Sequence, residues 1–236
     1  MKLNAERKPI DPLSKFWYKH SDQEESIDIA EQFSHVKVEA KETRIHVSLI
    51  DSESGSTSIS PIIRNSVKHN VHNDTLFLKL LDKKANYLGL NIAKPLQSLT
   101  ILNAEGSATF EPQLVENMKL NIGGQSEFSL NMPHRADNDT LLTLIPNLAI
   151  SVSDKSKLYL SQYYIGKLDV NLQNGLLRYA PNLKVDTMNV QLVGKSALSS
   201  TEPGNINQVN VLNVAGKSDF FRRDMIGQDV KINMIQ

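Results

Sequence analysis

The residues from Thr100 to Phe221 repeat one short pattern of apolar and small residues about every 20 positions. In each repeat, three mostly apolar residues alternate with other residues ahead of a turn, and a mostly small residue follows the turn. Apolar residues at every second position are typical of a β-strand, and a fixed period of this length is typical of a solenoid. The residues that follow the turns are Ala108, Ser126, Ser156, Leu176, Ser196 and Ser218.

This repeat predicts an all-β chain that folds as a single right-handed parallel β-helix, a solenoid whose rungs stack roughly 4.8 Å apart. The regular rungs are expected over 99–221, after a less regular β-rich N-terminal part over 26–98. An N-terminal arm over 1–25 and a C-terminal cap over 222–236 complete the predicted organisation. The alternating segments 33–40 and 44–49 are interpreted as a hairpin-like pair of strands.

The alternation also predicts which residues of each rung point inward. In the second to fifth rungs these residues are all apolar, beginning with Met118. The first and last rungs assign the same role to Thr100, Leu102, Ala104, Asn210, Leu212 and Val214.

The fourth rung departs from this pattern at one position. Strict register would turn Arg178 inward, where an unpaired charge is costly to bury. A one-residue bulge after Gly175 would instead turn Leu177 and Tyr179 inward. We therefore expect Arg178 to be exposed.

A second regularity concerns polar residues five positions before each turn-following residue. On the outer face of the rungs they would form a ladder, in which side-chain amides can hydrogen-bond along the stack. We interpret this ladder as structural, with a glycan- or ice-binding face as the alternative; a Thr-x-Thr array, expected of a flat ice-binding face, is absent. Its members are Asn103, Asn121, Ser151, Asn171, Gln191 and Asn213.

The composition argues against several classes of function. The chain has no cysteine, which removes disulfides, cysteine–zinc sites and thiol catalysis together. Its 26 basic and 26 acidic residues leave no net charge, which argues against nucleic acid as a partner. No apolar segment approaches the length of a membrane span, and the first thirty residues contain no signal-peptide core. We therefore expect neither membrane insertion nor an export signal in this chain.

Motifs for catalysis are also missing. The sequence contains no nucleophile elbow, P-loop or dinucleotide fingerprint, and it implies no cofactor. Polysaccharide lyases and hydrolases need two or three acids that converge on one face. The carboxylates of Asp154, Asp169, Asp186 and Asp219 fall at different phases of the rungs, so we expect no such cluster.

Two polar stretches offer possible cation ligands. An insertion at 133–140 lengthens one rung, and its Asp137 and Asp139 carry oxygen ligands for calcium, but these fall short of a full coordination set. His69 and His72 could bind a transition metal only if a third ligand came from elsewhere. We favour a solvated turn and a polar loop, and predict no metal.

Tyr159, Tyr163 and Tyr164 form a local concentration of aromatic residues. Aromatic faces bind sugars and protein partners well. Packing of a rung corner is the simpler interpretation, and the one that we favour. If the chain has a binding surface, we expect it at these tyrosines and at the insertion that contains Asp137 and Asp139.

The order of several motifs resembles a known family. Residues 33–38 (FSHVKV), 44–49 (RIHVSL) and 73–80 (NDTLFLKL) are similar to the start of the head GIN-domain family, the adhesin heads of auto-transporters from Bacteroidetes-type bacteria. Rungs of that family end in Ser-Gly-Ala-Ser-x-Leu, to which 124–128, 194–198 and 216–220 are similar. The resemblance covers 29–221 and implies a parallel β-helix in the periplasm or at the cell surface, without catalytic residues. The 133–140 insertion, the fourth rung and the missing export signal depart from the family pattern.

We predict a non-enzymatic protein of the cell envelope, an adhesin-like binding or scaffolding domain. A glycan or a surface protein is the expected partner, and the ligand itself is unknown. Two alternatives stay open. A β-helix carbohydrate-active enzyme, of the polysaccharide lyase or hydrolase type, needs a cleft where acids of adjacent rungs meet. A self-assembling β-helix scaffold needs uncapped apolar ends.

Overall fold

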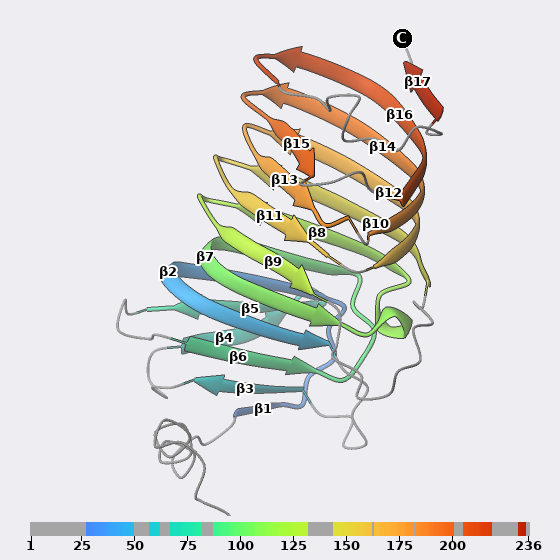
Figure 1. Cartoon of the computed structure of the whole chain (residues 1–236). Coiled ribbons are helices and arrows are strands. Elements are labelled where there is room, and N and C mark those ends of the chain that lie inside the picture. The colour runs from blue at the N-terminus through green and yellow to red at the C-terminus, as the bar shows by residue number, and fades with distance from the viewer. Residues whose placement is uncertain are drawn as a thin grey trace, which may run out of the picture.

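The computed structural model describes residues 27–49, 57–61, 67–81, 87–131, 144–161, 163–181, 183–200, 205–218 and 231–234. All strands in these ranges belong to one hydrogen-bonded sheet of mixed direction, which is not closed into a barrel (Figure 1). This part of the chain contains no α-helix, and its one helical turn is the 3₁₀ segment η3 (Pro112–Leu114). The prediction of an all-β chain is confirmed.

The first strands pair in both directions. β1 (Ile27–Ile29) pairs antiparallel with β3 (Thr57–Pro61), β3 with β6 (Tyr87–Ile92), and β4 (Val67–His72) with β5 (Thr75–Leu80). By contrast, β2 (His35–Leu49) pairs parallel with β5, β6 and β7 (Ser98–Phe110). The predicted hairpin over 33–49 is wrong, because β2 is one strand of 15 residues whose two halves pair with β5 and β6 instead of with each other.

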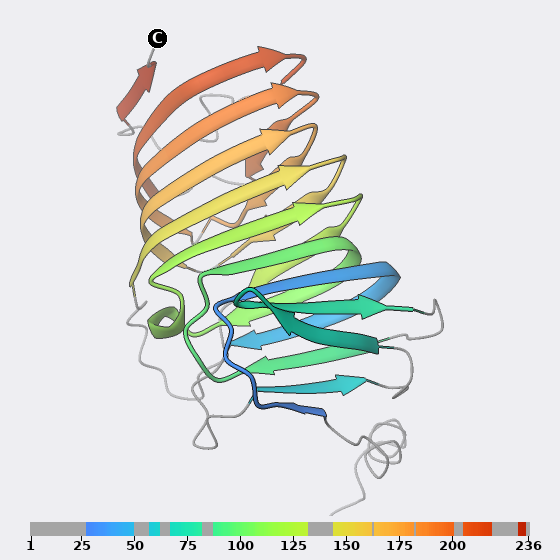
Figure 2. The ribbon, with the colours of Figure 1, turned by 180° about the vertical axis from the view of Figure 1, so that it is seen from behind.

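The later strands all pair parallel, and alternate strands pair with each other. We call β8, β10, β12, β14, β16 and β17 the first ladder, and β9, β11, β13 and β15 the second ladder. Figure 2 shows the long strands of the first ladder stacked in yellow to red. The bounds are β8 (Asn117–Gly123), β9 (Glu127–Asn131), β10 (Leu144–Ser153), β11 (Lys157–Leu160), β12 (Tyr164–Gln173), β13 (Leu176–Tyr179), β14 (Lys184–Gly194), β15 (Ala197–Ser200), β16 (Asn205–Gly216) and β17 (Lys231–Met234).

The strand β7 joins the two ladders into one sheet. Its first half pairs with β8 and its second half pairs with β9. β2 lies on the other edge of β7 along most of its length. One turn of chain therefore contributes a strand to each ladder, and the core lies between them.

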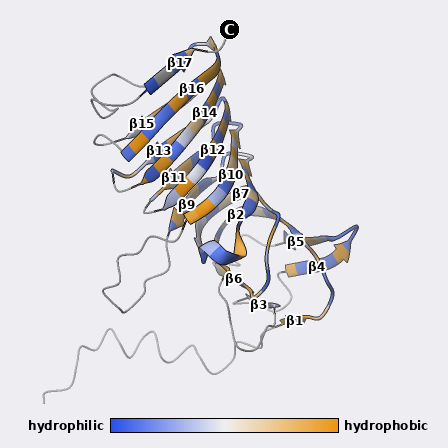
Figure 3. Ribbon diagram, turned by 90° about the vertical axis from the view of Figure 1, so that its right-hand side faces the viewer, coloured by the Kyte–Doolittle hydropathy of each residue, from blue (hydrophilic) through white to orange (hydrophobic). Residues whose placement is uncertain are grey.

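The core consists of columns of apolar side chains, as alternation along each strand predicts (Figure 3). Met118, Leu148, Leu168 and Met188 are aligned on neighbouring strands and are each at most 1% exposed. The other predicted inward residues of the second to fifth rungs are also buried. Their predicted direction is confirmed.

The first and last rungs correct the predicted register. In the first half of β7 the buried residues are Leu99 and Ile101, which align with Leu120 and Ile122, whereas Thr100 and Leu102 are only half-buried. In β16 the buried residues are Val209 and Val211, so Asn210 points outward. A β-bulge then occurs opposite Val190 and Gln191 and leaves Leu212 46% exposed.

Three of the serines that follow the turns, Ser126, Ser156 and Ser196, are buried, and their hydroxyls form hydrogen bonds with backbone groups. The hydroxyls of Ser126 and Ser196 donate to the carbonyls of Gly123 and Val193, both at 2.6 Å. Ser126 Oγ also accepts a hydrogen bond from the backbone N–H of Ala104 at 3.1 Å. Ala104, not Ala108, is therefore the residue of the first rung that corresponds to Ser126.

The buried residues of the fourth rung align with those of the neighbouring rungs because the turn of the fourth rung is one residue shorter than theirs. Asn174 and Gly175 alone lie between the paired residues Gln173 and Leu176. As predicted, Leu177 and Tyr179 are buried and Arg178 is exposed. The cause is a missing turn residue and not an inserted bulge residue.

Candidate functional site

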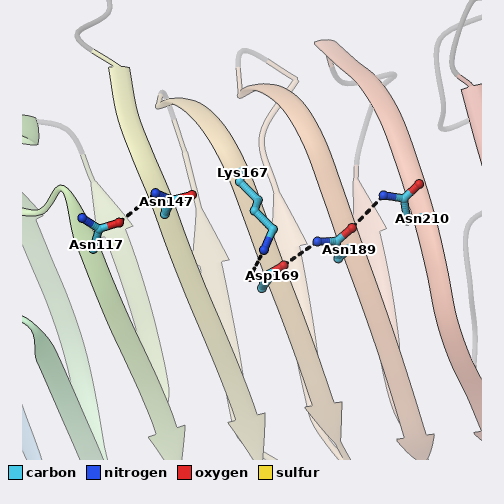
Figure 4. A network of polar contacts seen from close by, with 6 residues as sticks. All are labelled: Asn117, Asn147, Lys167, Asp169, Asn189 and Asn210. Atoms are coloured by element: carbon cyan, nitrogen blue, oxygen red, sulfur yellow. Dashed lines mark hydrogen bonds and ion pairs between the residues drawn. The ribbon is translucent and has the colours of Figure 1, made fainter.

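The outward surface of the first ladder is a polar surface made mainly of side-chain amides. We define the amide face as the outward side chains of β8, β10, β12, β14 and β16. Its central column of hydrogen bonds begins at Asp169, whose Oδ1 accepts from Asn189 at 2.6 Å. Asn189 in turn accepts from Asn210 at 2.8 Å (Figure 4). Asn210 accepts from Asn233 on β17 at 2.8 Å.

The same face contains few charges, and these are partly paired. Lys167 Nζ donates to Asp169 Oδ2 at 3.0 Å. One column away, Asn147 Nδ2 donates to Asn117 Oδ1 at 2.7 Å (Figure 4). Each amide has two N–H donors and two acceptor lone pairs. Because the column uses only some of them, fixed donors and acceptors remain available on the outer surface.

The polar ladder predicted from the sequence lies two residues along from this column. Asn121, Ser151, Asn171, Gln191 and Asn213 are aligned on successive strands, which confirms their predicted alignment. Thr100 takes the place predicted for Asn103 and accepts a hydrogen bond from Asn121 Nδ2 at 3.2 Å. Asn103 instead occupies a turn with a φ of 56°.

Tyr164 borders the amide face where β12 begins. Its hydroxyl donates to the two carboxylate oxygens of Asp186 at 3.3 and 3.2 Å, and Asn207 Nδ2 donates to the same carboxylate at 3.0 Å. The hydrogen bond to Asp186 raises the pKa of the Tyr164 hydroxyl above its ordinary value. Tyr164 also aligns with Leu144, the first residue of β10, where the chain returns from the 133–140 insertion.

Tyr159 lies on the second ladder and is only partly buried. The guanidinium carbon of Arg178 lies 6.0 Å from its ring centroid. Its hydroxyl donates to Glu127 at 3.3 Å, and Lys157 Nζ donates to the same carboxylate at 2.9 Å. The bond from Lys157 is the main cause that lowers the pKa of Glu127.

Tyr163 is 0% exposed and does not contribute to a surface. Its hydroxyl donates to the carbonyl of Asn131, the last residue of β9, and accepts from the backbone N–H of Phe110 at 3.3 Å. Burial raises the pKa of this hydroxyl. The prediction that Tyr163 belongs to a binding surface is therefore wrong. Tyr163 is a core residue whose hydroxyl fixes the end of β9, in agreement with the alternative interpretation that the tyrosines pack a rung corner.

The three tyrosines thus separate in space. Tyr159 lies on the second ladder, Tyr163 in the core and Tyr164 beside the first ladder. The sequence pattern does not identify the side-chain column from Asp169 to Asn233, because the bulge in β16 shifts the register counted from Ser218, which assigns Asn210 to the inward side. The recurrence of its members at the rung spacing is the signal that could have indicated it.

Of the candidate cation ligands, the two histidines are not brought together. Asp137 and Asp139 lie outside the described residues. His69 and His72 are exposed on β4 in a strand instead of a loop, and an odd spacing along a strand directs side chains to opposite faces. Within the described ranges, no group of three or more histidines, aspartates and glutamates could hold a metal ion.

The acids of the rungs also remain separate. Asp154 accepts from Ser153 Oγ at 2.9 Å at a turn, whereas Asp169 and Asp186 are held in different columns of the amide face. Asp219 lies outside the described residues. Nowhere in the described chain is there a helix both long and apolar enough to cross a membrane.

Comparison with known proteins extends the description of the fold. No family model matches the sequence, and no curated protein matches it. A solved structure of a candidate lipid-binding protein from Parabacteroides distasonis matches with a TM-score of 0.51 and 11% identity, over 92% of this chain and 98% of that chain. This likeness shows a shared fold.

Two candidate adhesins align with lower scores. One from Parabacteroides distasonis has a TM-score of 0.44 and 12% identity, over 90% of this chain and 96% of its own. One from Bacteroides fragilis has a TM-score of 0.37 and 13% identity, over 91% of this chain and 98% of its own. These scores are too low for us to base an argument on them.

Proposed function

We propose that the chain is a non-enzymatic, adhesin-like binding domain of the cell envelope that belongs to the head GIN-domain family. In this proposal the two ladders are the walls of a right-handed parallel β-helix, the hand that parallel crossovers strongly prefer. The ordered motifs over 29–221 and the parallel register of β8 to β16 support it. The envelope location rests on the family resemblance.

The observation that carries the binding role is the hydrogen-bonded amide column from Asp169 to Asn233. Hydrogen bonds along the column hold each amide in one orientation. A ligand that binds to them therefore requires little further ordering of side chains, which is one of the costs of binding to a polar surface.

The chemistry of the face favours a neutral glycan as its ligand. Sugar hydroxyls both donate and accept hydrogen bonds, and amides offer both kinds of group in one plane. Tyr164 adds an aromatic ring at the border of the face, and aromatic faces pack well against sugars. The rungs repeat at roughly 4.8 Å, close to the length of one sugar unit, so that successive units can meet successive rungs.

A glycan array, followed by hydrogen exchange with the bound glycan, tests this proposal. We expect a neutral oligosaccharide to bind and to slow exchange in β10, β12 and β14 more than in β9, β11 and β13. Protection confined to the second ladder would contradict the assignment of the amide face. Retention of surface proteins by the immobilised chain, with no glycan bound, would make the partner a protein.

A further inference from the structure

The edge of the molecule where the ladders meet carries a notch at the fourth rung. In the third rung, Asp154, Lys155 and Ser156 lie between the paired residues Ser153 and Lys157. In the fourth rung only Asn174 and Gly175 fill this interval. The third and fifth rungs each carry a lysine at the turn, Lys155 and Lys195, and the shorter fourth rung places Asn174 between their backbones. The carbonyl of Asn174 accepts from the backbone N–H of Lys155 at 2.8 Å, and its Oδ1 accepts from that of Lys195 at 3.0 Å.

A shallow groove of about 750 Å³ occupies this notch. Residues along its floor include Gly175, Leu176 and Ala197. The fourth rung has glycine where its neighbours have serine, and a Cβ added at Gly175 would lie 2.5 Å from the carbonyl oxygen of Val152. Glycine at this position avoids a clash with the Val152 backbone, and Gly175, Leu176 and Ala197 give the groove an uncharged part of its lining.

The walls of the notch are basic. Lys155, Lys157 and Lys195 line it, together with one carboxylate, that of Asp154. Lys157 is paired with Glu127, but Lys155 and Lys195 are exposed and have no ion pair within the described ranges. Asp154 is engaged by Ser153 Oγ at 2.9 Å. The notch therefore has an excess of positive charge on a chain whose net charge is zero.

Beyond the groove, the second ladder carries an aromatic residue and a further cation. Lys157 and Tyr159 lie on one strand, and Leu176 and Arg178 lie on the next. Tyr159 and Arg178 each lie two residues beyond the notch residue of their strand, which is roughly 7 Å along the strand. Beside Arg178 lies Ser199, whose hydroxyl oxygen is buried without a hydrogen-bond partner in the described part. A further cation and an aromatic face thus lie on the second ladder beside the notch.

We propose that this notch binds an acidic glycan. Its anionic substituent lies between the ammonium groups of Lys155 and Lys195, and its sugar ring packs on Gly175, Leu176 and Ala197. Further units pass over Tyr159 toward Arg178. This site lies on the second ladder and its edge, so it does not depend on the amide face being a binding surface.

Calorimetric titration with galacturonate oligomers tests the proposal, and the same oligomers with methyl-esterified carboxyls serve as a neutral control. We expect the acidic hexamer to bind at least about tenfold more tightly than its methyl ester. Replacing both notch lysines (Lys155→Gln with Lys195→Gln) should weaken acidic hexamer binding by about tenfold, which is 1.4 kcal/mol. The matched pair Lys37→Gln with Lys68→Gln removes equal charge from the N-terminal strands β2 and β4 and should leave binding unchanged.

Several results would overturn the proposal. The proposal fails if the acidic hexamer does not bind, and it fails if the methyl ester binds with the same affinity as the acidic hexamer. An equal loss in the two double variants would mean that overall charge, and not the notch, attracts the ligand. If inorganic phosphate or phosphatidylglycerol vesicles bind as tightly as the hexamer, the anion or a lipid headgroup is sufficient and the glycan assignment fails. Tyr159→Ala should weaken binding of the hexamer and leave binding of the dimer unchanged, and an unchanged hexamer affinity would remove Tyr159 from the site.

Discussion

The serines after the turns show why a small residue alone is not sufficient at these positions. Each of Ser126, Ser196 and Ser218 donates to the carbonyl three residues earlier in the turn. Ser196 Oγ also contacts the carbonyl of Leu172 in the rung below at 3.0 Å. Buried carbonyls without such partners would be costly. The hydroxyl therefore stabilises the turn and links it to the neighbouring rung.

Ser196→Leu should destabilise the fold by about 1–3 kcal/mol, because Ser196 is 2% exposed and a larger side chain overpacks the corner. Urea denaturation measures the change. Ser151→Leu is the matched control, since Ser151 faces outward on the first ladder. Equal midpoints for wild type and Ser196→Leu would contradict the inward direction of this column.

Tyr163→Phe should cost about 1–3 kcal/mol, because it leaves the N–H of Phe110 without its partner in the core. Tyr159→Phe loses only a long hydrogen bond on the surface and should stay within about 0.5 kcal/mol of wild type. Thermal denaturation of both variants tests the difference. If they are equally stable, Tyr163 does not have the structural role assigned to it.

The pair of Glu127 and Lys157 should make stability depend on pH in the acid range. The pKa of Glu127 is lowered in the folded chain, so its contribution is present above its ordinary pKa of 4.5 and is lost as the pH falls through the folded value. Glu127→Gln should therefore be less stable than wild type at pH 7, and the difference should shrink by pH 3. Urea midpoints at both pH values test this, and a constant difference would contradict the pairing.

At the scale of the strand, the sequence predicts the second to fifth rungs well because their inward columns are apolar in only one phase. The first rung fails for the opposite reason. Leu99 and Ile101 occupy one phase and Leu102 and Ala104 the other, so alternation alone does not select the register. The prediction for the last rung is wrong because β16 has a bulge at Leu212, and a periodic sequence pattern does not reveal a bulge.

The N-terminal strands were harder to predict because their pairing is not local. The two halves of β2 resemble a hairpin in sequence, yet each half pairs with a later strand in parallel. Only residues far along the chain determine this choice. Strands whose partners are distant in sequence give no turn signal that would reveal their direction.

The candidate site shows the same limit of local reasoning. Tyr163 and Tyr164 are adjacent, but successive residues of a strand point to opposite sides. A cluster of tyrosines in the sequence is therefore not a cluster on the surface. The sequence predicts that a column of amide side chains exists, because polar residues recur at the rung period. It does not predict which residues form the column.

For the whole molecule, the pairing predicts a gradient of stability along the stack. β12 has a parallel neighbour on each side, whereas residues 213–216 of β16 pair only with β14 within the described ranges. Val214 lies in the column of Leu172 and Leu192, yet it is 42% exposed and they are 0% exposed. Hydrogen exchange should be slowest in β12 and fastest at 213–216. Uniform protection would contradict this gradient.

The central claim is that the outward face of the first ladder binds ligand. The most direct test is the affinity of two blocked variants for the glycan that the array selects. Thr187→Arg places a long side chain in the middle of the amide face, between Lys167 and Gln208, and Ser129→Arg does the same on the second ladder. The account predicts that Thr187→Arg lowers the affinity by at least about tenfold and that Ser129→Arg does not change it. Loss of binding in Ser129→Arg alone would contradict the account.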